Sequence, residues 1–441
     1  MTNNPGLVIA APASGSGKTV LTLGLLRHLA SMGSNVASAK TGPDYIDPAF
    51  HAAATGRPCL NLDPWAMRPD TLAQAVFSLA READVVICEG VMGLFDGAFV
   101  GKGEPCGSTA DLSRATGWPV VLVIDAGAQA ASAAAVLKGF ATFEAGVEVL
   151  GVVFNRVGSE RHGTILRDAC AQSVAEIPVL GCLPRTPGLE LPERHLGLVQ
   201  AGEHKDLEGF LNRAGAWVAE HLDVDGLVTL ARPLALSGGP PDPSLPPMAP
   251  LGQRIAVAAD PAFAFSYPLV IDGWRDAGAE VVPFSPLAGE GPDGDADAVY
   301  LPGGYPELHA GALAAASGFM DGLALTLTSS CHLEDGRFLE ASWDNYFYTR
   351  QWNVPPEVEV VPPTCPVFST SRTCKPSSAP TSAAVMPPAP APQTSRSTSL
   401  MSVVTRLSLS DGCMAGLSFG PPAGVGQGGP EGRSARSGRS R

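Results

Sequence analysis

Short apolar runs alternate with longer amphipathic stretches through roughly the first two hundred residues. Most of these runs are rich in β-branched side chains, as expected for parallel strands that are buried on both faces. Helical patterns separate them, notably over Gln129–Phe143 and His162–Val174. The alternation predicts an α/β fold with a doubly wound parallel sheet, whose ligands bind at the carboxyl ends of the strands. The predicted strands are Leu7–Ala10, Val36–Ala39, Asp84–Cys88, Val120–Ile124, Val149–Phe154 and Val179–Leu183.

A second, shorter α/β pattern follows a proline- and glycine-rich stretch at residues 233–252. Its strands are predicted at Arg254–Ala259, Ala279–Phe284 and Ala296–Leu301, and its helices at Phe265–Ala277 and from about 307 to 323. The periodicity then breaks, and from about Pro355 the chain is rich in Pro, Ser and Thr, a composition that need not fold. We expect a first domain over 1–232, a linker over 233–252, an incomplete second domain over 253–323 and a divergent, largely low-complexity tail over 324–441.

Charge and cysteine usage narrow the class of protein. The chain has 29 basic and 43 acidic residues and a formal net charge of −14, which disfavours a nucleic-acid partner. No apolar run approaches the ~20 residues of a membrane span, and the N-terminus lacks the pattern of a signal peptide. The nine cysteines are scattered without a Cys-x-x-Cys pair. This usage is typical of reduced thiols, so we expect a cytoplasmic protein without a membrane partner.

Residues 11–19, Ala-Pro-Ala-Ser-Gly-Ser-Gly-Lys-Thr, stand between the first strand and the helix that follows it. Glycines there let backbone N–H groups face an anion at the helix N-terminus, the lysine can reach terminal phosphates, and the threonine hydroxyl can ligate magnesium. Pro12 occupies a position where the usual pattern has glycine, and an ordinary Gly/Ser loop is the alternative. We favour a phosphate loop for ATP and Mg²⁺, formed by Ser14, Gly15, Ser16, Gly17, Lys18 and Thr19.

Charged side chains also follow the next two strands. Lys40, Asp44 and Asp47 come after the second strand, and Glu89 ends the third. Magnesium binds a few hard oxygen ligands and keeps waters and phosphate oxygens in its other positions. Glu89 and one of the two aspartates, together with Thr19, would supply such oxygens. The alternative is that both aspartates are turn or cap residues, but a lone acid at the end of an apolar strand would be costly.

Six blocks of the chain, at residues 11–19, 40–51, 89–97, 154–162, 191–198 and 300–308, carry a family resemblance over about residues 5 to 323. The most specific are Lys-Thr-Gly-Pro-Asp-Tyr-Ile-Asp-Pro-Ala-Phe-His at 40–51 and Leu-Pro-Glu-Arg-His-Leu-Gly-Leu at 191–198. The chain resembles the cobyrinate or hydrogenobyrinate a,c-diamide synthases of corrinoid biosynthesis. The resemblance implies a carbon–nitrogen ligase that amidates the a and c carboxylates of a corrin ring. ATP would convert each carboxylate to an acyl phosphate, which ammonia attacks, usually with glutamine as the nitrogen donor.

The same resemblance assigns roles to individual residues. It implies that Asp44, Asp47, Glu89 and Asp96 share metal binding and substrate activation, without dividing these roles among them. Lys40 would neutralise charge during phosphoryl transfer together with Lys18. The resemblance further implies nucleotide contacts by Asn155 and Arg156, and substrate contacts by Tyr45, Arg194 and His195. Outside their block, Arg194 and His195 would be interpreted as an arginine at a helix start and a surface histidine.

In this family the second domain is a class I glutamine amidotransferase-like α/β domain with a glutaminase cysteine. Gly303 and Gly304 resemble its oxyanion-hole turn. The family's Gly-Glu-Cys-Gly-Gly elbow is expected near position 337, where this chain has Gly-Arg-Phe at 336–338. Cys331 is the nearest thiol and lacks elbow glycines, although the run Leu323–Thr328 before it fits a strand. His332 is the last histidine, so no later cysteine has a downstream histidine partner.

We therefore expect no working glutaminase nucleophile and the use of free ammonia. A shift of reading frame or a fusion after about residue 323 would account for the altered C-terminal part. The expected partners are a corrinoid substrate and ammonia or glutamine, and a homodimer is left open. Alternative hypotheses are a cobyric-acid-synthase-like or dethiobiotin-synthetase-like ligase, a nucleotide-binding protein without catalysis, and a defective product with an exposed sheet edge.

Overall fold

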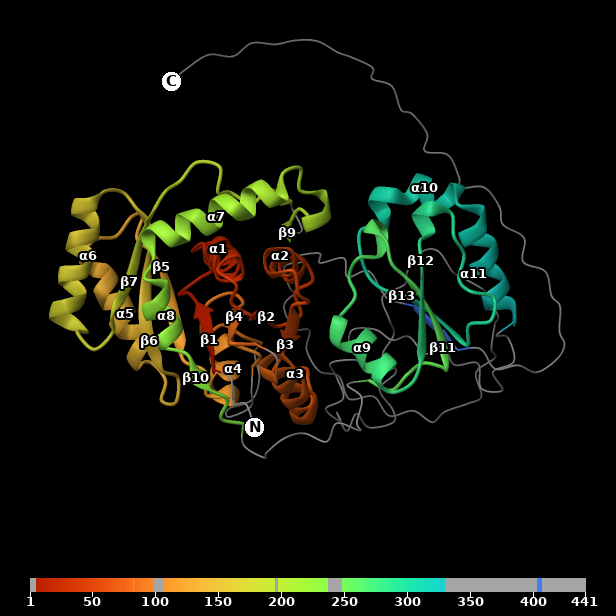
Figure 1. Ribbon diagram of the computed structural model, residues 1–441, viewed down its shortest axis with the longest axis horizontal. Coiled ribbons are helices and arrows are strands. Elements are labelled where there is room, and N and C mark those ends of the chain that lie inside the picture. Colours follow the sequence, from red (N-terminus) through yellow and green to blue (C-terminus); the bar gives the residue numbers. More distant parts are fainter. Residues whose placement is uncertain are drawn as a thin grey trace, which may run out of the picture.

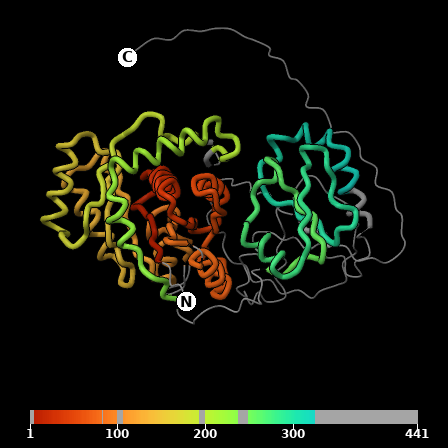
Figure 2. Tube along the Cα trace, in the orientation of Figure 1, coloured from red at the N-terminus to blue at the C-terminus, as the bar shows by residue number. Residues whose placement is uncertain are grey.

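The computed structural model describes residues 5–81, 83–98, 106–194, 197–236, 248–329 and 403–406. Two α/β units stand side by side (Figure 1). The first unit consists of the described residues from 5 to 236, and the second of residues 248–329 with 403–406. Figure 2 follows the chain by colour from red to yellow-green in the first unit and from green to blue-green in the second.

The first unit is built on a parallel sheet with the strand order β3-β2-β4-β1-β5-β6-β7. A short strand, β10 (Arg232–Pro233), pairs antiparallel with β1 where the first unit ends. Because β1 is central and its neighbours β4 and β5 both run parallel to it, the phosphate loop leaves the middle of the sheet. The parallel strands are β1 (Pro5–Ala10), β2 (Val36–Thr41), β3 (Leu60–Leu62), β4 (Val85–Glu89), β5 (Val120–Asp125), β6 (Val149–Val157) and β7 (Val179–Pro184).

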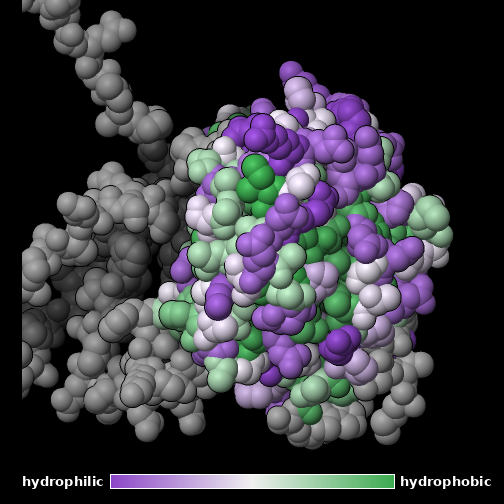
Figure 3. All heavy atoms as spheres, turned by 90° about the vertical axis from the view of Figure 1, so that its left-hand side faces the viewer, coloured by the Kyte–Doolittle hydropathy of each residue, from purple (hydrophilic) through white to green (hydrophobic). Residues whose placement is uncertain are grey.

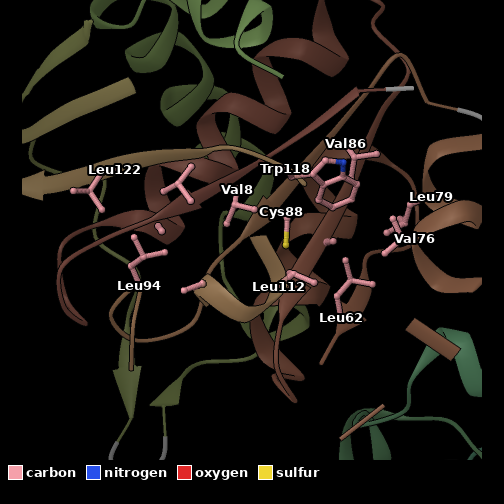
Figure 4. Close-up of a cluster of buried hydrophobic side chains, with 14 of the residues drawn as sticks. Val8, Leu62, Val76, Leu79, Val86, Cys88, Leu94, Leu112, Trp118 and Leu122 are labelled. Carbon is pink, nitrogen blue, oxygen red and sulfur yellow. The ribbon is translucent and has the colours of Figure 1, made fainter. Parts of the chain in front are cut away.

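Helices cover both faces of this sheet, and side chains alternate between two cores. Leu7 and Ile9 of β1 face one core, and Val8 and Ala10 face the other. Figure 4 shows the second of these, in which Trp118 is fully buried in one cluster with Val86 and Cys88 of β4 and with Val76, Leu79 and Leu112. The first core is closed by α1 (Lys18–Ser31), α2 (Ile46–Thr55), α7 (Leu207–His221) and α8 (Val224–Thr229), and the second by α3 (Pro69–Arg81), α4 (Thr109–Thr116), α5 (Ser132–Thr142) and α6 (Glu160–Ser173).

The outer face of the first unit, seen in Figure 3, carries hydrophilic residues crossed by bands of exposed hydrophobic ones. A two-stranded ribbon of β8 (Glu193–Arg194) and β9 (Gly197–Leu198) and a single turn, η1 (Ala201–Glu203), precede α7. The five cysteines of the described residues are free thiols. None of the helices in the described ranges is both long and apolar enough to cross a membrane.

The second unit has a smaller sheet with the order β12-β11-β13-β14. Three strands are parallel, and β14 (Val403–Arg406) joins antiparallel along β13 (Ala298–Leu301), so this edge of the sheet is paired. The other elements are β11 (Arg254–Ala258), η2 (Pro261–Phe263), α9 (Pro268–Asp276), β12 (Glu280–Phe284), η3 (Pro286–Ala288), η4 (Pro306–His309), α10 (Ala310–Ala315) and α11 (Ser317–Ser329).

The structure confirms the predicted α/β class and all six strands predicted in the first unit. It adds β3, a strand of three residues, Leu-Asn-Leu, which is too short to show a hydrophobic periodicity in the sequence. The helix expected from about 307 to 323 is divided at Ala316 into α10 and α11. The strand considered at Leu323–Thr328 is wrong. These residues continue α11, because no proline interrupts the helix between Ser317 and Ser329.

Candidate active site

The phosphate loop runs from the end of β1 to the start of α1. Gly15 and Gly17 have φ angles of 75° and 90°, in the left-handed region that glycine adopts readily. The Ser16 hydroxyl donates to the carbonyl oxygen of Ala13 at 2.8 Å and holds the turn closed. The loop therefore has the bent backbone and the helix N-terminus that bind phosphate.

The Lys18 ammonium is buried inside this loop. It donates to the carbonyl oxygen of Met92 at 2.6 Å and to that of Ala13 at 3.5 Å, and the side chain keeps 7% of its exposure. Burial lowers the pKa of Lys18, although the nearby Glu89 carboxylate acts in the opposite direction. A buried ammonium held by carbonyl oxygens alone is well matched to a phosphate group, because phosphate would supply the missing negative charge.

Glu89, the last residue of β4, is fully buried and has partners on three elements. Its Oε1 accepts from the Thr19 hydroxyl at 2.6 Å and from Lys40 Nζ at 2.9 Å. Its Oε2 lies 2.7 Å from His51 Nε2, and the other ring nitrogen of His51 lies 3.4 Å from the Cys59 thiol. Burial acts to raise the pKa of Glu89, but Lys40 and His51 overcome it and hold the pKa far below its ordinary value.

Lys40 joins this carboxylate to a second one. Its ammonium also bonds the Asp47 carboxylate in the first turn of α2, and the lysine is buried. Burial would lower the pKa of Lys40, but Glu89 and Asp47 raise it, so the ammonium stays charged. Burial raises the pKa of Asp47 against the attraction of Lys40. The result is a compact group of alternating charges directly below the phosphate loop.

Asp44 and Asp96 lie at the edges of this group and both bond backbone N–H groups. Asp44 Oδ1 accepts from the N–H groups of Ile46 and Asp47 at 2.8 and 3.1 Å, so Asp44 caps the start of α2 as well as lining the cavity. Asp96 is exposed and its Oδ2 accepts from the N–H of Gly93 at 2.9 Å. The turn that Asp96 closes holds the Met92 carbonyl that Lys18 bonds.

Asn155 and Arg156 lie near the end of β6 but differ in their contacts. Asn155 Nδ2 donates to the carbonyl oxygen of Ser16 at 2.9 Å, and its Oδ1 accepts the N–H of Arg156 at 2.8 Å. Asn155 is thus a brace for the phosphate loop. Arg156 has a φ of 59°, pairs with Asp125 and lines the cavity, and its contact with a nucleotide stays a prediction.

A cavity of about 750 Å³ opens in front of these groups. It is lined by residues of the phosphate loop and by apolar and aromatic side chains, among them Leu189 and Leu191. Tyr45 is part of it, stacked on Phe265 of the second unit with ring centroids 4.8 Å apart and an interplanar angle of 10°. The predicted site residues that line the cavity are Ser14, Gly15, Gly17, Lys18, Thr19, Lys40, Asp44, Tyr45, Asp47, Glu89 and Arg156.

The remaining predicted residues lie elsewhere. Arg194 belongs to β8, while His195 and Cys331 lie outside the described residues. Gly303 and Gly304 form the turn after β13 in the second unit. His51 is not among the predicted site residues, although it is the last residue of the 40–51 block. Phe265 and Tyr305, which line the cavity from the second unit, are not among them either, although Tyr305 directly follows the two glycines.

The donor set fits magnesium held jointly by protein and phosphate. The Thr19 hydroxyl and a Glu89 carboxylate oxygen lie 2.6 Å apart, and both are hard oxygen ligands. Across the described ranges, no group of three or more His, Cys, Asp or Glu side chains is arranged to hold a metal ion. Magnesium usually takes only one or two protein ligands and fills the rest of its octahedron with water and phosphate, so a pair of oxygens suffices.

Comparisons with known proteins agree with this geometry. The family described as "CobQ/CobB/MinD/ParA nucleotide binding domain" (CbiA) matches residues 7–199. Hydrogenobyrinate a,c-diamide synthase of Brucella anthropi is 54% identical over 321 residues, which cover 72% of this chain and 71% of that protein. The protein of the same description from Mesorhizobium japonicum is 52% identical over 335 residues, covering 76% and 75%. The chain belongs to the hydrogenobyrinate a,c-diamide synthase family.

Family membership confirms the resemblance found in the sequence and makes the chain an amide-forming ligase. The matched nucleotide-binding domain contains the phosphate loop and all the charged groups around Glu89, so nucleotide binding belongs to the first unit. More than a quarter of this chain lies outside its match to the Brucella anthropi diamide synthase.

Proposed function

We propose that the chain amidates the a and c carboxylates of hydrogenobyrinate or cobyrinate with ATP and ammonia. The observation that supports this most is that the phosphate loop and Lys40 line the same cavity as several apolar and aromatic side chains. A corrinoid carboxylate can reach the γ-phosphate there while its macrocycle stays in contact with apolar side chains. The relatives are named for amidation of this kind of substrate.

The reaction needs charge neutralisation more than it needs an acid or base. A carboxylate oxygen of the substrate attacks the γ-phosphorus, the bond to the β-phosphate oxygen breaks, and ADP leaves. Lys18 and Lys40 lie on either side of this transfer and offset the charge of the phosphoryl group. Magnesium, held by Thr19 and Glu89, would neutralise the nucleotide phosphates when bound.

Ammonia completes the reaction. Its nitrogen attacks the carbonyl carbon of the acyl phosphate, inorganic phosphate leaves with the electron pair of the C–O bond, and the nitrogen loses a proton. Asp47 pairs with Lys40 and Asp44 lines the same cavity, so the two aspartates can hold the carboxylate end of the substrate through Lys40 and accept hydrogen bonds from ammonia. The cycle then repeats on the second carboxylate.

We propose ammonia as the nitrogen source because the described residues of the second unit do not bring the parts of a glutaminase together. The second unit contains no cysteine within its described residues 248–329. Its glycine turn at Gly303 therefore has no thiol of that segment beside it. A glutaminase needs a cysteine at a strand-to-helix elbow together with a histidine, and no cysteine after Cys331 has a histidine downstream of it.

The test is an assay of ADP release and of amidated corrinoid by mass spectrometry, with hydrogenobyrinate and either ammonium or glutamine. We expect both products with ammonium and neither with glutamine, and Lys18→Ala abolishes both. ATP binding without substrate-dependent ADP release would contradict the proposed ligase activity. Turnover with glutamine that disappears in Cys331→Ala would contradict the ammonia requirement alone.

A further inference from the structure

Four aromatic side chains meet where the two units touch, and we call Tyr45, Phe265, Tyr267 and Tyr305 the aromatic cluster. Tyr45 of the first unit stacks on Phe265 and contacts Tyr267 with a centroid distance of 4.7 Å. Phe265 meets Tyr305 edge to face at 5.1 Å. The Tyr267 hydroxyl donates to the carbonyl oxygen of Pro43 at 3.5 Å. Three members, all except Tyr267, also line the cavity.

The backbone of the second unit sets the positions of Phe265 and Tyr305. The Phe265 N–H donates to the carbonyl oxygen of Gly303 at 2.8 Å, which joins the loop after β11 to the turn after β13. A Cβ at Gly304 would lie 1.9 Å from the carbonyl oxygen of Ala262, so only glycine allows this approach. The two glycines that resemble an oxyanion turn thus hold two aromatic rings in contact at the cavity wall.

The geometry that phosphoryl transfer requires indicates which ligand would lie against the aromatic cluster. The nucleotide phosphates would occupy the phosphate loop, where Asn155 bonds the Ser16 carbonyl and lies against Gly17. The group that receives the γ-phosphate must lie beyond Lys18, on the side of Lys40 and Asp44. Tyr45 directly follows Asp44 in the chain, so the aromatic cluster belongs to the acceptor side of the cavity.

We propose that Phe265 and Tyr305 form, with Tyr45, the binding wall for the apolar macrocycle of the acceptor substrate. The second unit then serves substrate binding in this chain, independently of any glutaminase. This inference rests on the proposed function, because it takes the acceptor to be a flat macrocycle with carboxylates at its rim. Aromatic rings contribute a large apolar area with little loss of side-chain freedom, which suits such a ligand.

The test uses the full chain with Phe265→Leu and Tyr305→Leu, and Phe263→Leu as the matched control. Phe263 lies in the same loop but packs inside the second unit, with its ring centroid 6.1 Å from that of Phe319. Hydrogenobyrinate binding is measured without ATP by isothermal titration calorimetry, and MgATP binding is measured separately. We expect the first two variants to raise the Kd for hydrogenobyrinate at least about tenfold, with the Kd for MgATP unchanged within about twofold.

The controls separate binding from folding and from the proposed function. Phe263→Leu is expected to leave both Kd values within about twofold of the wild type, and Phe265→Tyr to retain most of the hydrogenobyrinate affinity. Equal affinity in the wild type, Phe265→Leu and Tyr305→Leu would overturn the aromatic wall and leave the ligase activity standing. Weakening by Phe263→Leu to the same degree would also overturn it, since the effect would then be structural. A wild type that binds no hydrogenobyrinate would overturn the proposed function and this inference together.

Discussion

At the scale of single residues, the site depends on a few groups whose partners are already in place. Glu89 bonds Thr19, Lys40 and His51 at the same time, so its carboxylate has one orientation before any ligand arrives. Asn155 supports the loop from β6. Such preorganisation reduces the reorganisation needed during phosphoryl transfer, which is why substitutions of these residues should have large effects.

Replacing Gly17 tests the close approach of Asn155 to the phosphate loop. A Cβ at Gly17 would lie 2.1 Å from Asn155 Nδ2, and the φ of 90° is strained for any other residue. We expect Gly17→Ala to abolish ATP binding in calorimetry. Gly15→Ala is the matched comparison, because Gly15 also has a positive φ but nothing lies within 4 Å of its Cβ position. It should bind ATP more tightly than Gly17→Ala, and equal losses would contradict the role given to Asn155.

Removing the charge of Glu89 tests the metal site. In Glu89→Gln, Lys40 and His51 lose their common carboxylate, so we expect amidation to fall at least about 100-fold. The free energy of unfolding should fall by about 3–5 kcal/mol, because breaking a buried pair leaves a charge uncompensated. Steady-state kinetics and urea unfolding measure the two effects. The exposed Glu160→Gln is the control, and a Glu89→Gln rate within about tenfold of the wild type would exclude Glu89 from the site.

At the scale of elements, local hydrogen bonds decide where the helices around the site begin. Ser108 and Asp111 form a capping box at the start of α4, in which each side chain accepts the N–H of the other residue. Asp111 also accepts the N–H of Cys106 at 2.8 Å, which ties the residues just before α4 to its first turn. Such a cap fixes the position of α4 against β1.

The capping box makes the stability of the protein depend on pH. Burial acts to raise the pKa of Asp111, but hydrogen bonds from Cys106 and Ser108 lower it below the ordinary value of 3.8. Because the pKa is lower in the folded state, the stabilisation is complete above pH 3.8 and is lost as the pH falls through the folded pKa. We expect Asp111→Ala to lower the free energy of unfolding by about 1 kcal/mol at pH 7 and by less at pH 3.

Urea unfolding at the two pH values measures this difference. Asp70→Ala in the first turn of α3 is the control, since Asp70 is exposed, and its effect should stay below about 0.5 kcal/mol. An effect of Asp111→Ala that does not shrink in acid would contradict the assignment to the ionised carboxylate.

At the scale of the whole molecule, ligand binding involves elements that lie far apart in the chain. The cavity is lined from the phosphate loop, the start of α2, the end of β4, the segment after β7 and the second unit. The parts of the site therefore depend on the folded sheet and on the contact between the two units. A ligand that bridges them will stabilise the folded state, because the unfolded chain offers no such site.

Nucleotide binding should be visible as a rise in the melting temperature. At MgATP concentrations of about 100 times Kd, binding raises the free energy of unfolding by about 2.7 kcal/mol. For a domain of about 150–250 residues this corresponds to a rise in melting temperature of roughly 5–10 °C. Differential scanning fluorimetry measures the shift. We expect EDTA to reduce the shift produced by ATP and Lys18→Ala to remove it. An ATP shift that is insensitive to EDTA would contradict the magnesium site.

Consecutive residues are enough to predict the phosphate loop, the order of strands and helices, and the charged residues at the strand ends. These features are encoded in consecutive residues, so spacing and side-chain type suffice to predict them. Asp44 illustrates the limit, because both the metal and the cap interpretation were open, and the structure places its Oδ1 on the N–H groups of Ile46 and Asp47.

Contacts between residues that lie far apart in the chain are seen only in the folded structure. His51 reaches Glu89 across 38 positions, and Asn155 reaches Ser16 across 139. The aromatic cluster joins Tyr45 to Phe265 and Tyr305 of another unit. The hydrophobic periodicity of a segment predicts the face on which a side chain lies. It does not predict which residue that side chain contacts, because strand order and the contact between the two units set such contacts. The phosphate loop is therefore a local property of this chain, whereas the contact that braces it and the aromatic cluster are properties of the fold.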